Sequence, residues 1–478
     1  MTTRPVVFWF RRDLRTSDHP ALQAAAAAGP VLPVFVLDPH LLSRSGAPRR
    51  AYLKACLRAL GVDVPLVVRA GPPVEALSVL IAESSATAVY ATEDFGPYGR
   101  ARDASVAARL NSLGVAFERV GSPYLVAPGT VRKPDGAPYR VFTPFYRAWS
   151  EKAQSEKAWS ERANASTEQA VARWHLGPRS DPIAAMTADV PVGLPEAGER
   201  AALDRLERFA TQRVARYHEE RDRPDLDSTS RLSSDLKFGV LHPRQVLAAL
   251  GPLDKGREVF RKEIGWREFY ADVLFHQPGS ARQALQPKME AMRCDAGPVA
   301  EARFGAWCTG RTGYPFVDAG MRQLLAEGWM HNRVRMVVAS FLVKDLHLDW
   351  RVGARHFMRH LIDGDLASNQ HGWQWTAGTG TDAAPYFRVF NPVSQGRKFD
   401  PDGHYVRRWI PELADIRGGA VHEPHAEAEL GLLEGLGDGS GRGAYPSPIV
   451  DHGAERDEAL TRYSEVRADA VVDDRRSS

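Results

Sequence analysis

Residues 6–15 read VVFWFRRDLR, an unbroken apolar run that is followed at once by a charged turn. A short run of this kind predicts a strand buried on both faces, as in a parallel sheet covered by helices. Similar apolar runs follow at 31–37, 65–69 and 88–92, with helix-like segments near 18–28, 50–60, 73–84 and 99–113 between them. The alternation predicts an α/β domain over residues 1–128, built on a doubly wound parallel sheet of five strands.

A sheet of this type binds ligands beyond the carboxyl ends of its strands. A nicotinamide-binding domain would place Gly-x-Gly-x-x-Gly directly after the first strand. Residues 10–15 read FRRDLR instead. The sequence therefore argues against a nicotinamide site.

The rest of the chain changes character twice. Residues 129–195 are rich in Pro, Gly, Ala and charge, which predicts an interdomain connector with some helix. From residue 196 the apolar periodicity is helical to about residue 360, and a last short helix is expected near 453–467. We therefore predict a mostly α-helical C-terminal domain over residues 196–470.

Composition limits the functional classes. Three cysteines are too few for a disulfide framework, and no apolar run approaches the roughly 20 residues of a membrane span. The first strand follows Met1 to Pro5 without a leader, so we expect a cytosolic protein without a membrane partner. A net charge of +3 does not identify a nucleic-acid partner, but many of the eleven tryptophans lie among arginines between residues 266 and 409. Such mixtures suit stacked bases and phosphates.

Two runs in the helical region could bind a ligand. Residues 229–239 (TSRLSSDLKFG) place several hydroxyls ahead of a helix, as a phosphate site or an ordinary N-cap would. Residues 263–270 (EIGWREFY) put Glu263, Trp266 and Arg267 on one helical face. A tryptophan on a helix is more often a core residue, so both interpretations remain open.

Two further runs are more distinctive. Residues 329–336 (WMHNRVRM) place a polar Asn332 on an otherwise apolar helical stripe. Residues 363–375 (DGDLASNQHGWQW) could be a loop with solvated charges, or could surround a planar heterocycle. His356 and His360 are four residues apart but lack the glutamate of a zinc helix, so no metal site is predicted.

Taken in this order, these runs resemble the photolyase/cryptochrome family along nearly the whole chain. Residues 8–15 resemble its opening motif, and residues 363–392 resemble its flavin loop. The resemblance implies an antenna-binding N-terminal domain and a helical FAD-binding domain that encloses a U-shaped FAD. The implied flavin contacts are Tyr217, Thr229, Ser230, Leu232, Ser233, Arg267, Asn332, Arg335, Asp363, Asp365 and Asn369. Arg335 and Asp363 match an ion pair of the family, and Asn369 matches the position that faces flavin N5.

The resemblance further implies light-driven repair of cyclobutane pyrimidine dimers in UV-damaged DNA, by electron transfer from excited FADH⁻. Photolyases carry Asn at the position of Asn369, where many cryptochromes carry Asp or Cys. The residues that match the pocket for the flipped-out dimer are Glu263, Trp266, Asn332, Met336 and Trp375. Those that match phosphate contacts are Arg221, Arg333 and Arg388. The (6-4) branch uses paired histidines, which residues 329–332 lack.

Two other interpretations stay open: a blue-light photoreceptor of the cryptochrome type, and an α/β domain fused to an unrelated helical domain. The first lacks the long C-terminal extension that usually marks it, and the second requires the order of the motifs to be a coincidence. The repair enzyme that the resemblance implies is expected to be a monomer.

The chain departs from the family pattern at three places. Trp373 and Trp350 match two tryptophans of the electron-transfer chain, but residues 292–299 (MRCDAGPV) contain no third. Phe260 stands where a tryptophan near the flavin is common. The usual antenna ligands for methenyltetrahydrofolate are replaced by Arg44, Tyr98 and Gly99. A deazaflavin bordered by residues 48–53 and 96–103, or an empty pocket, is expected instead.

Overall fold

Strand β1 (Val6–Phe10) is the central strand of a five-stranded sheet. The computed structural model describes residues 4–163, 173–183, 193–381, 388–425 and 445–476. The other strands are β2 (Val31–Leu37), β3 (Val67–Ala70), β4 (Ala88–Ala91) and β5 (Ala116–Arg119). Their order is β3-β2-β1-β4-β5 and every neighbouring pair is parallel, which confirms the predicted sheet.

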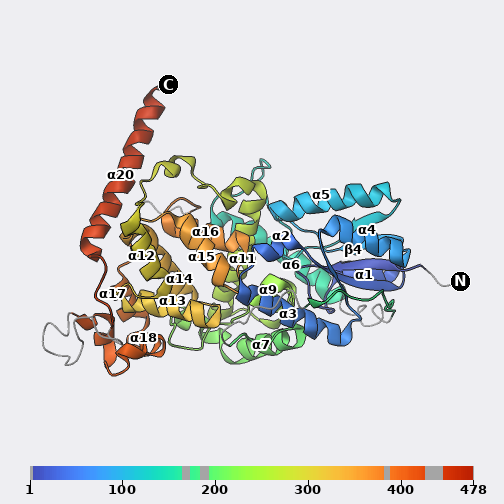
Figure 1. Ribbon diagram of the computed structural model, residues 1–478, viewed down its shortest axis with the longest axis horizontal. Coiled ribbons are helices and arrows are strands. Elements are labelled where there is room, and N and C mark those ends of the chain that lie inside the picture. The colour runs from blue at the N-terminus through green and yellow to red at the C-terminus, as the bar shows by residue number, and fades with distance from the viewer. Residues whose placement is uncertain (1–3, 164–172, 184–192, 382–387, 426–444, 477–478) are drawn as a thin grey trace.

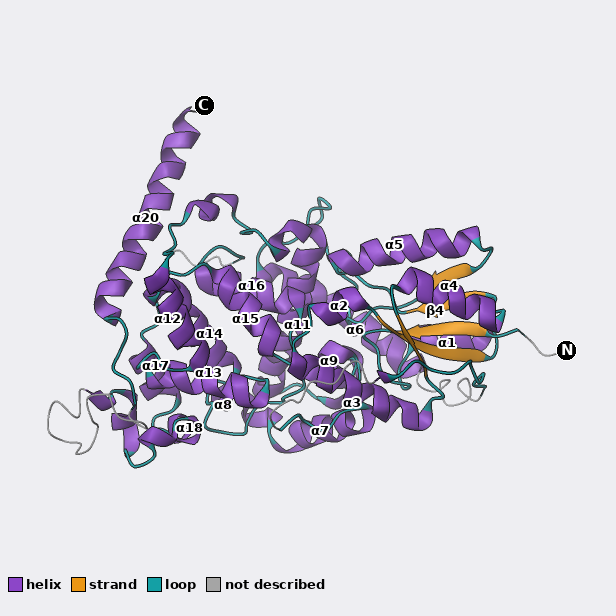
Figure 2. Ribbon diagram, in the orientation of Figure 1, coloured by secondary structure: helices purple, strands orange, loops and turns teal. Residues whose placement is uncertain are grey.

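Both faces of β1 are covered by helices, and the strand is fully buried for that reason (Figure 2). Val6, Phe8 and Phe10 pack in one cluster with α1 (Pro20–Ala28) and α3 (Ala47–Asp63). Val7 and Trp9 pack on the opposite face with α4 (Pro73–Ser84) and α5 (Pro97–Ser112). A short α2 (Pro39–Ser43) follows β2. Side chains that alternate between two cores require the continuous apolar run seen in the sequence.

The connector contains one long helix, α6 (Phe142–Ala163). Beyond it the chain returns to the sheet, where Trp174 forms a parallel bridge with Val31 and the Ala70 amide donates to the Asp181 carboxylate at 2.8 Å. Residues on both sides of the connector share the largest buried cluster, which extends from the sheet into the helical region. The boundaries at residues 128 and 195 stay a prediction.

The second domain is helical, as predicted, and no strand occurs in its described residues (Figure 1). Its first helices are α7 (Glu199–Gln212), α8 (Tyr217–Glu220), α9 (Ser233–Phe238), α10 (Pro243–Ala249), α11 (Lys255–His276) and α12 (Pro298–Thr309). The next are α13 (Pro315–Glu327), α14 (Asn332–Ser340), α15 (Trp350–His360), α16 (Leu366–Ala377), α17 (Pro392–Phe399), α18 (His404–Trp409) and α20 (His452–Arg476). None of the helices described is both long and apolar enough to span a membrane.

Two segments differ from the expectations. The run 363–375, for which a loop was one interpretation, is mostly the helix α16. Asp365 caps the first turn by accepting from the Ser368 amide at 3.2 Å, and Gly378 ends the helix in the left-handed region. The last helix is also longer than predicted, because it continues past residue 467 to Arg476 and extends from the body of the protein (Figure 1).

The two domains meet where the charged turn after β1 contacts the end of α9. The Leu14 amide donates to the Phe238 carbonyl at 3.2 Å, and the Arg15 guanidinium donates to the Gly239 carbonyl at 3.1 Å. Gly239 has φ +64°, and a Cβ atom there would lie 1.9 Å from the carbonyl oxygen of Arg12. A glycine is therefore required at this contact.

Candidate functional site

The candidate residues of the helical domain come from five regions that are far apart in sequence. Helix α16 packs against α11, α14 and α15, and α11 packs against α8. These contacts bring together the start of α8, the middle of α11, the start of α14 and most of α16, and a hydrogen bond from Arg267 to the Leu236 carbonyl joins α9 to α11. Every implied flavin contact lies on one of these elements or directly before it.

Arg335 and Asp363 form the predicted ion pair. Their closest atoms, Nη2 and Oδ2, are 2.8 Å apart, and a second contact from Nη1 to Oδ1 measures 3.3 Å. The Arg335 Nε also donates to the Met330 carbonyl at 2.8 Å. Because the Asp363 side chain is only 3% exposed, Arg335 supplies the partner that a buried carboxylate needs.

Asp365 joins the two domains. Its carboxylate lies 2.6 Å from the guanidinium of Arg12, in the turn after β1, and 3.8 Å from the ammonium of Lys237 in α9. Burial opposes ionisation of Asp365, but the charges of Arg12 and Lys237 outweigh it and lower the pKa of the carboxyl group. Burial and the adjacent Arg12 charge lower the pKa of Lys237 to about 7.

The turn before α9 carries the hydroxyl groups of the predicted phosphate site at residues 229–239. Thr229 and Ser230 are half-buried, Leu232 is buried, and Ser233 is exposed at the first position of the helix. Arg231 adopts the left-handed conformation between them, with φ +52°. The turn thus presents hydroxyl groups of graded exposure.

Tyr217 and Arg267 lie on either side of this turn. Tyr217 begins α8 and packs its ring edge-on against Phe260, with centroids 5.2 Å apart, so Phe260 keeps an aromatic contact here. Arg267 donates to the Leu236 carbonyl at 3.2 Å, and its guanidinium lies 4.6 Å from the ring centroid of Tyr124. Arg267 therefore also contacts the N-terminal domain.

Asn369 is half-buried in α16. Its amide nitrogen donates to the Ala354 carbonyl at 3.1 Å and to the Gln370 side chain at 2.8 Å. Two donated bonds hold the amide plane in one orientation. The side chain is therefore positioned by α15 rather than free to rotate.

The residues predicted to contact a lesion are accessible rather than sealed in a core. Trp266 and Trp375 are half-buried, on α11 and α16. Phe142 of α6 stacks on Trp266 with centroids 3.7 Å apart and an interplanar angle of 9°. At the start of α14, Asn332 is exposed and its amide lies 4.0 Å from the sulfur of Met336.

The arginines predicted to contact DNA phosphates have charged or aromatic partners within the protein. Arg221 pairs with Glu263 at 2.5 Å, and Arg333 pairs with Asp222 at 2.9 Å. Burial raises the pKa of Glu263, and the ion pair with Arg221 opposes that rise. Arg388 is exposed, with its guanidinium 5.8 Å from the ring centroid of Trp375.

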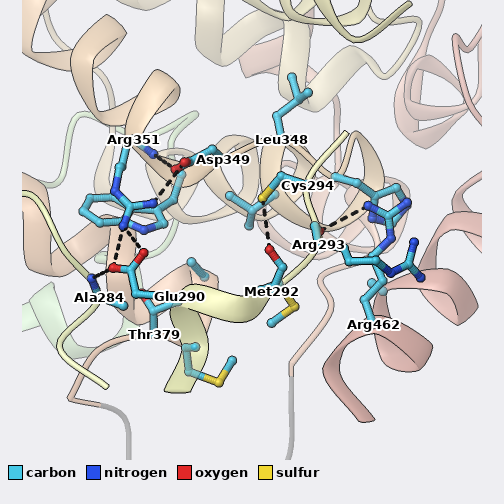
Figure 3. A pocket seen from close by; sticks show the side chains of 16 residues that line it. Ala284, Glu290, Met292, Arg293, Cys294, Leu348, Asp349, Arg351, Thr379 and Arg462 are labelled. Carbon is cyan, nitrogen blue, oxygen red and sulfur yellow. Dashed lines mark hydrogen bonds and ion pairs between the residues drawn. The ribbon is translucent and has the colours of Figure 1, made fainter. Parts of the chain in front are cut away.

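The two matched tryptophans have different surroundings. Trp373 is buried in α16, and its ring centroid is 6.1 Å from that of Trp307. Trp350 begins α15 and lines a cavity of about 220 Å³, together with Cys294, Arg351 and Thr379 (Figure 3). Residues 292–294, where a third tryptophan was sought, form part of the wall of this cavity.

The residues considered for an antenna are engaged within the protein. Tyr98 donates to Asp38 and stacks on His40 with centroids 4.1 Å apart. Tyr52 is fully buried and donates to Asp235 of the helical domain at 2.8 Å. Arg49 is also buried, and its guanidinium donates to the Arg44 carbonyl at 3.0 Å and to the Gly364 carbonyl of the helical domain at 3.5 Å.

Sequence reasoning missed several residues of the site. Arg12 and Lys237 stood within quoted runs, but nothing in the sequence linked them to Asp365. Phe142 lies in the predicted connector, and Trp307 lies outside all the runs that suggested a ligand. Each of these roles depends on a contact across more than 60 residues of sequence.

Metal ligands are not gathered anywhere in the described part of the chain, where no group of three or more His, Cys, Asp or Glu residues could hold an ion. The rings of His356 and His360 are 4.5 Å apart, and burial lowers the pKa of His356 to about 3. Residues 382–387, part of the run matched to the flavin loop, lie outside the described residues.

Comparison with known proteins gives matches along the whole chain. Residues 6–165 match the family model described as DNA photolyase, and residues 260–465 match the FAD binding domain of DNA photolyase. The deoxyribodipyrimidine photo-lyase of Halobacterium salinarum is 38% identical, covering 97% of this chain and 99% of the relative. A crystal structure of a class III photolyase from Agrobacterium tumefaciens is 36% identical, covers 98% of both chains and superposes with a TM-score of 0.84. A Synechocystis cryptochrome is 26% identical, covers 96% of this chain and 99% of its own, and has a TM-score of 0.82.

Proposed function

Because the chain belongs to the photolyase/cryptochrome family, we propose that it is a deoxyribodipyrimidine photo-lyase that repairs cyclobutane pyrimidine dimers in UV-damaged DNA. The observation that carries this proposal is the full-length identity of 38% to enzymes of that name. The lesion-pocket residues of the repair branch are all present in the chain, at Glu263, Trp266, Asn332, Met336 and Trp375.

The donor set suits a dinucleotide. Hydroxyls of Thr229, Ser230 and Ser233 would serve the phosphates, and Asp365 would serve a sugar hydroxyl. The indole nitrogen of Trp373 is buried without a hydrogen-bond partner among the described residues, which leaves a donor for a bound group. When bound, reduced FAD supplies the absorption of light and the electron that splits the dimer. The remaining flavin contacts are Tyr217, Leu232, Arg267, Asn332, Arg335, Asp363 and Asn369.

The protein's part in repair is to hold the everted lesion beside the flavin. Trp266 and Trp375 would stack on it, and a dimer costs less to extrude than a normal pair because it is poorly stacked. Phe142 already covers one face of Trp266, so the lesion would use the other. Glu263 would hydrogen-bond the pyrimidine edge once Arg221 turns to a phosphate.

Phosphate binding would therefore exchange ion pairs rather than create new ones. Arg221 and Arg333 would leave Glu263 and Asp222 for the DNA backbone, and Arg388 would join them. Breaking each ion pair within the protein offsets part of the free energy gained from the new phosphate contact. The affinity for DNA should still fall as salt rises, as for any phosphate contact. We propose that the protein acts as a monomer in the cytosol.

The direct test is loss of dimers from a UV-damaged oligonucleotide when the reduced protein is illuminated with blue light. We expect repair in the light and none in the dark. Trp266→Ala should weaken lesion binding about tenfold or more, because one stacking contact is lost. Trp409→Ala, which alters a half-buried tryptophan of α18, is the matched control. Dimers that persist under illumination would exclude the proposal.

The alternative is a photoreceptor, since a cryptochrome shares the fold. The discriminating residue is Asn369, which we propose favours the fully reduced flavin. Asn369→Asp should shift the flavin spectrum of purified, illuminated protein toward less reduced forms. An unchanged spectrum would remove this argument for repair.

We further propose that a deazaflavin-type antenna, rather than methenyltetrahydrofolate, occupies the N-terminal domain. The replacement residues Arg44, Tyr98 and Gly99 support this choice. A Cβ atom on Gly99 would lie 2.1 Å from the Asp94 side chain. A longer side chain that could bind folate therefore does not fit at this position. The absorption spectrum and mass of the extracted chromophore are the test, and a folate would contradict the assignment.

A further inference from the structure

The cavity beside Trp350 takes no part in the proposed repair chemistry. Its volume is about 220 Å³, below the range of about 300–1,000 Å³ that is usual for pockets of drug-sized ligands. Ala284, Met289, Met292 and Cys294 lie along one wall, and Ala459 and Arg462 of α20 lie along another (Figure 3). Trp350 is only 5% exposed, whereas Cys294 on the wall is exposed. The cavity therefore leads from the surface to the indole.

The lining suits a small ring that carries a hydroxyl group. Met289, Met292 and the indole of Trp350 supply an apolar and sulfur-rich surface, and thioethers make favourable contacts with aromatic rings. Thr379 also lines the cavity, and its side chain is 4% exposed. Its Oγ1 has no hydrogen-bond partner in the part of the chain that the structure describes. A buried hydroxyl without a partner is unusual, and rotation of the Thr379 side chain about χ1 would present it to a polar group of a ligand in the cavity.

The charges around the cavity favour a neutral ligand. Arg351 pairs with Glu290 at 2.6 Å and with Asp349 at 3.0 Å. Arg293 and Arg462 pair with Glu465 at 2.9 Å and Asp295 at 2.8 Å, respectively. Each guanidinium is thus already neutralised, so an anion would gain little.

The nearest charged neighbour of Trp350 is neutralised. The Arg351 guanidinium lies 5.1 Å from the ring centroid, and two carboxylates bind that guanidinium. A lone cation at this distance would oppose an oxidised, cationic indole. The two carboxylates reduce that opposition.

We propose that this cavity binds a small neutral phenol, which donates an electron to oxidised Trp350. The inference rests on the proposed function and on the electron-transfer role that the family resemblance implies for Trp373 and Trp350. The phenol gives one electron to the Trp350 radical cation and its hydroxyl proton to water. A neutral indole and a phenoxyl radical remain. The bound phenol stands in for the tryptophan that residues 292–299 lack.

The test uses the holoprotein with oxidised flavin and 4-methylphenol as the probe. The rate of flavin photoreduction should saturate as the phenol concentration rises, and benzyl alcohol, of similar size but hard to oxidise, should compete. Thr379→Val should raise the half-saturating concentration about tenfold, because one buried hydrogen bond is lost. Ala459→Phe should fill the cavity and abolish saturation. Thr309→Val, which alters an exposed threonine bonded within its own helix, should change neither value.

Binding is measured separately by ligand-observed NMR in the dark, where Thr379→Val should weaken the signal by the same factor. A rate that rises linearly with phenol, or a Thr379→Val protein with unchanged binding, would overturn the inference. The repair assay on chemically reduced protein does not require this cavity. Intact dimers there would reject the proposed function, whereas normal repair with linear phenol dependence would reject the phenol site alone.

Discussion

Asp365→Asn should destabilise the contact between the two domains. The substitution keeps the cap of α16, since Asn and Asp cap helices equally well, but it removes the negative charge. Arg12 and Lys237 would then face each other without a carboxylate. Loss of one partner of a buried ion pair costs about 3–5 kcal/mol. The Arg12 side chain is 28% exposed, so solvent screening lowers our expectation to about 2 kcal/mol.

The measurement is urea unfolding at one fixed concentration of protein and of added FAD. The matched control is Asp349→Asn, because Asp349 also caps a helix and pairs with an arginine. Asp349 is 37% exposed and its partner keeps Glu290, so we expect a loss of about 0.5 kcal/mol or less. Equal losses in the two variants would refute the view that Asp365 is the charge that joins the domains.

Three other changes test separate features. The free energy of unfolding of the wild type, relative to that of Lys237→Met, should rise between pH about 7 and about 10 by up to about 1.4 kcal/mol per pH unit, because only the unfolded chain keeps the Lys237 proton in this range. Unfolding both proteins at pH 7 and 9.5 measures the rise. A difference between the two proteins that stays constant with pH would contradict the lowered pKa of Lys237. Gly239→Ala should lower the free energy of unfolding by about 3 kcal/mol or more, because its Cβ clashes with the Arg12 carbonyl. Gly251→Ala, at a glycine with the same φ but open space around it, should lower it by about 1 kcal/mol. Thermal unfolding measures both losses, and similar values would show that the domain contact adjusts to the added methyl group. Arg333→Ala should lower the salt slope of DNA affinity by about one without changing lesion preference, and an unchanged slope would exclude a phosphate contact.

Local patterns predicted the elements that are built from nearby residues. The run VVFWF could only be a strand between two cores, and the structure buries all five side chains. The run 363–375 was harder to interpret, because its charges also suit a loop. Asp365, one of the charges that suggested a loop, is the residue that caps the start of the helix, and Gly378 ends it.

The sequence by itself determined the order of the elements, the buried strands and the side chains available for chemistry, because these follow from local periodicity and residue type. Only the tertiary structure decided which charges meet. Arg12 and Asp365 are 353 residues apart, and Phe142 meets Trp266 across another long separation. Such pairings, and the cavity at Trp350, arise from the packing of distant helices, and no short-range pattern in a single chain records them.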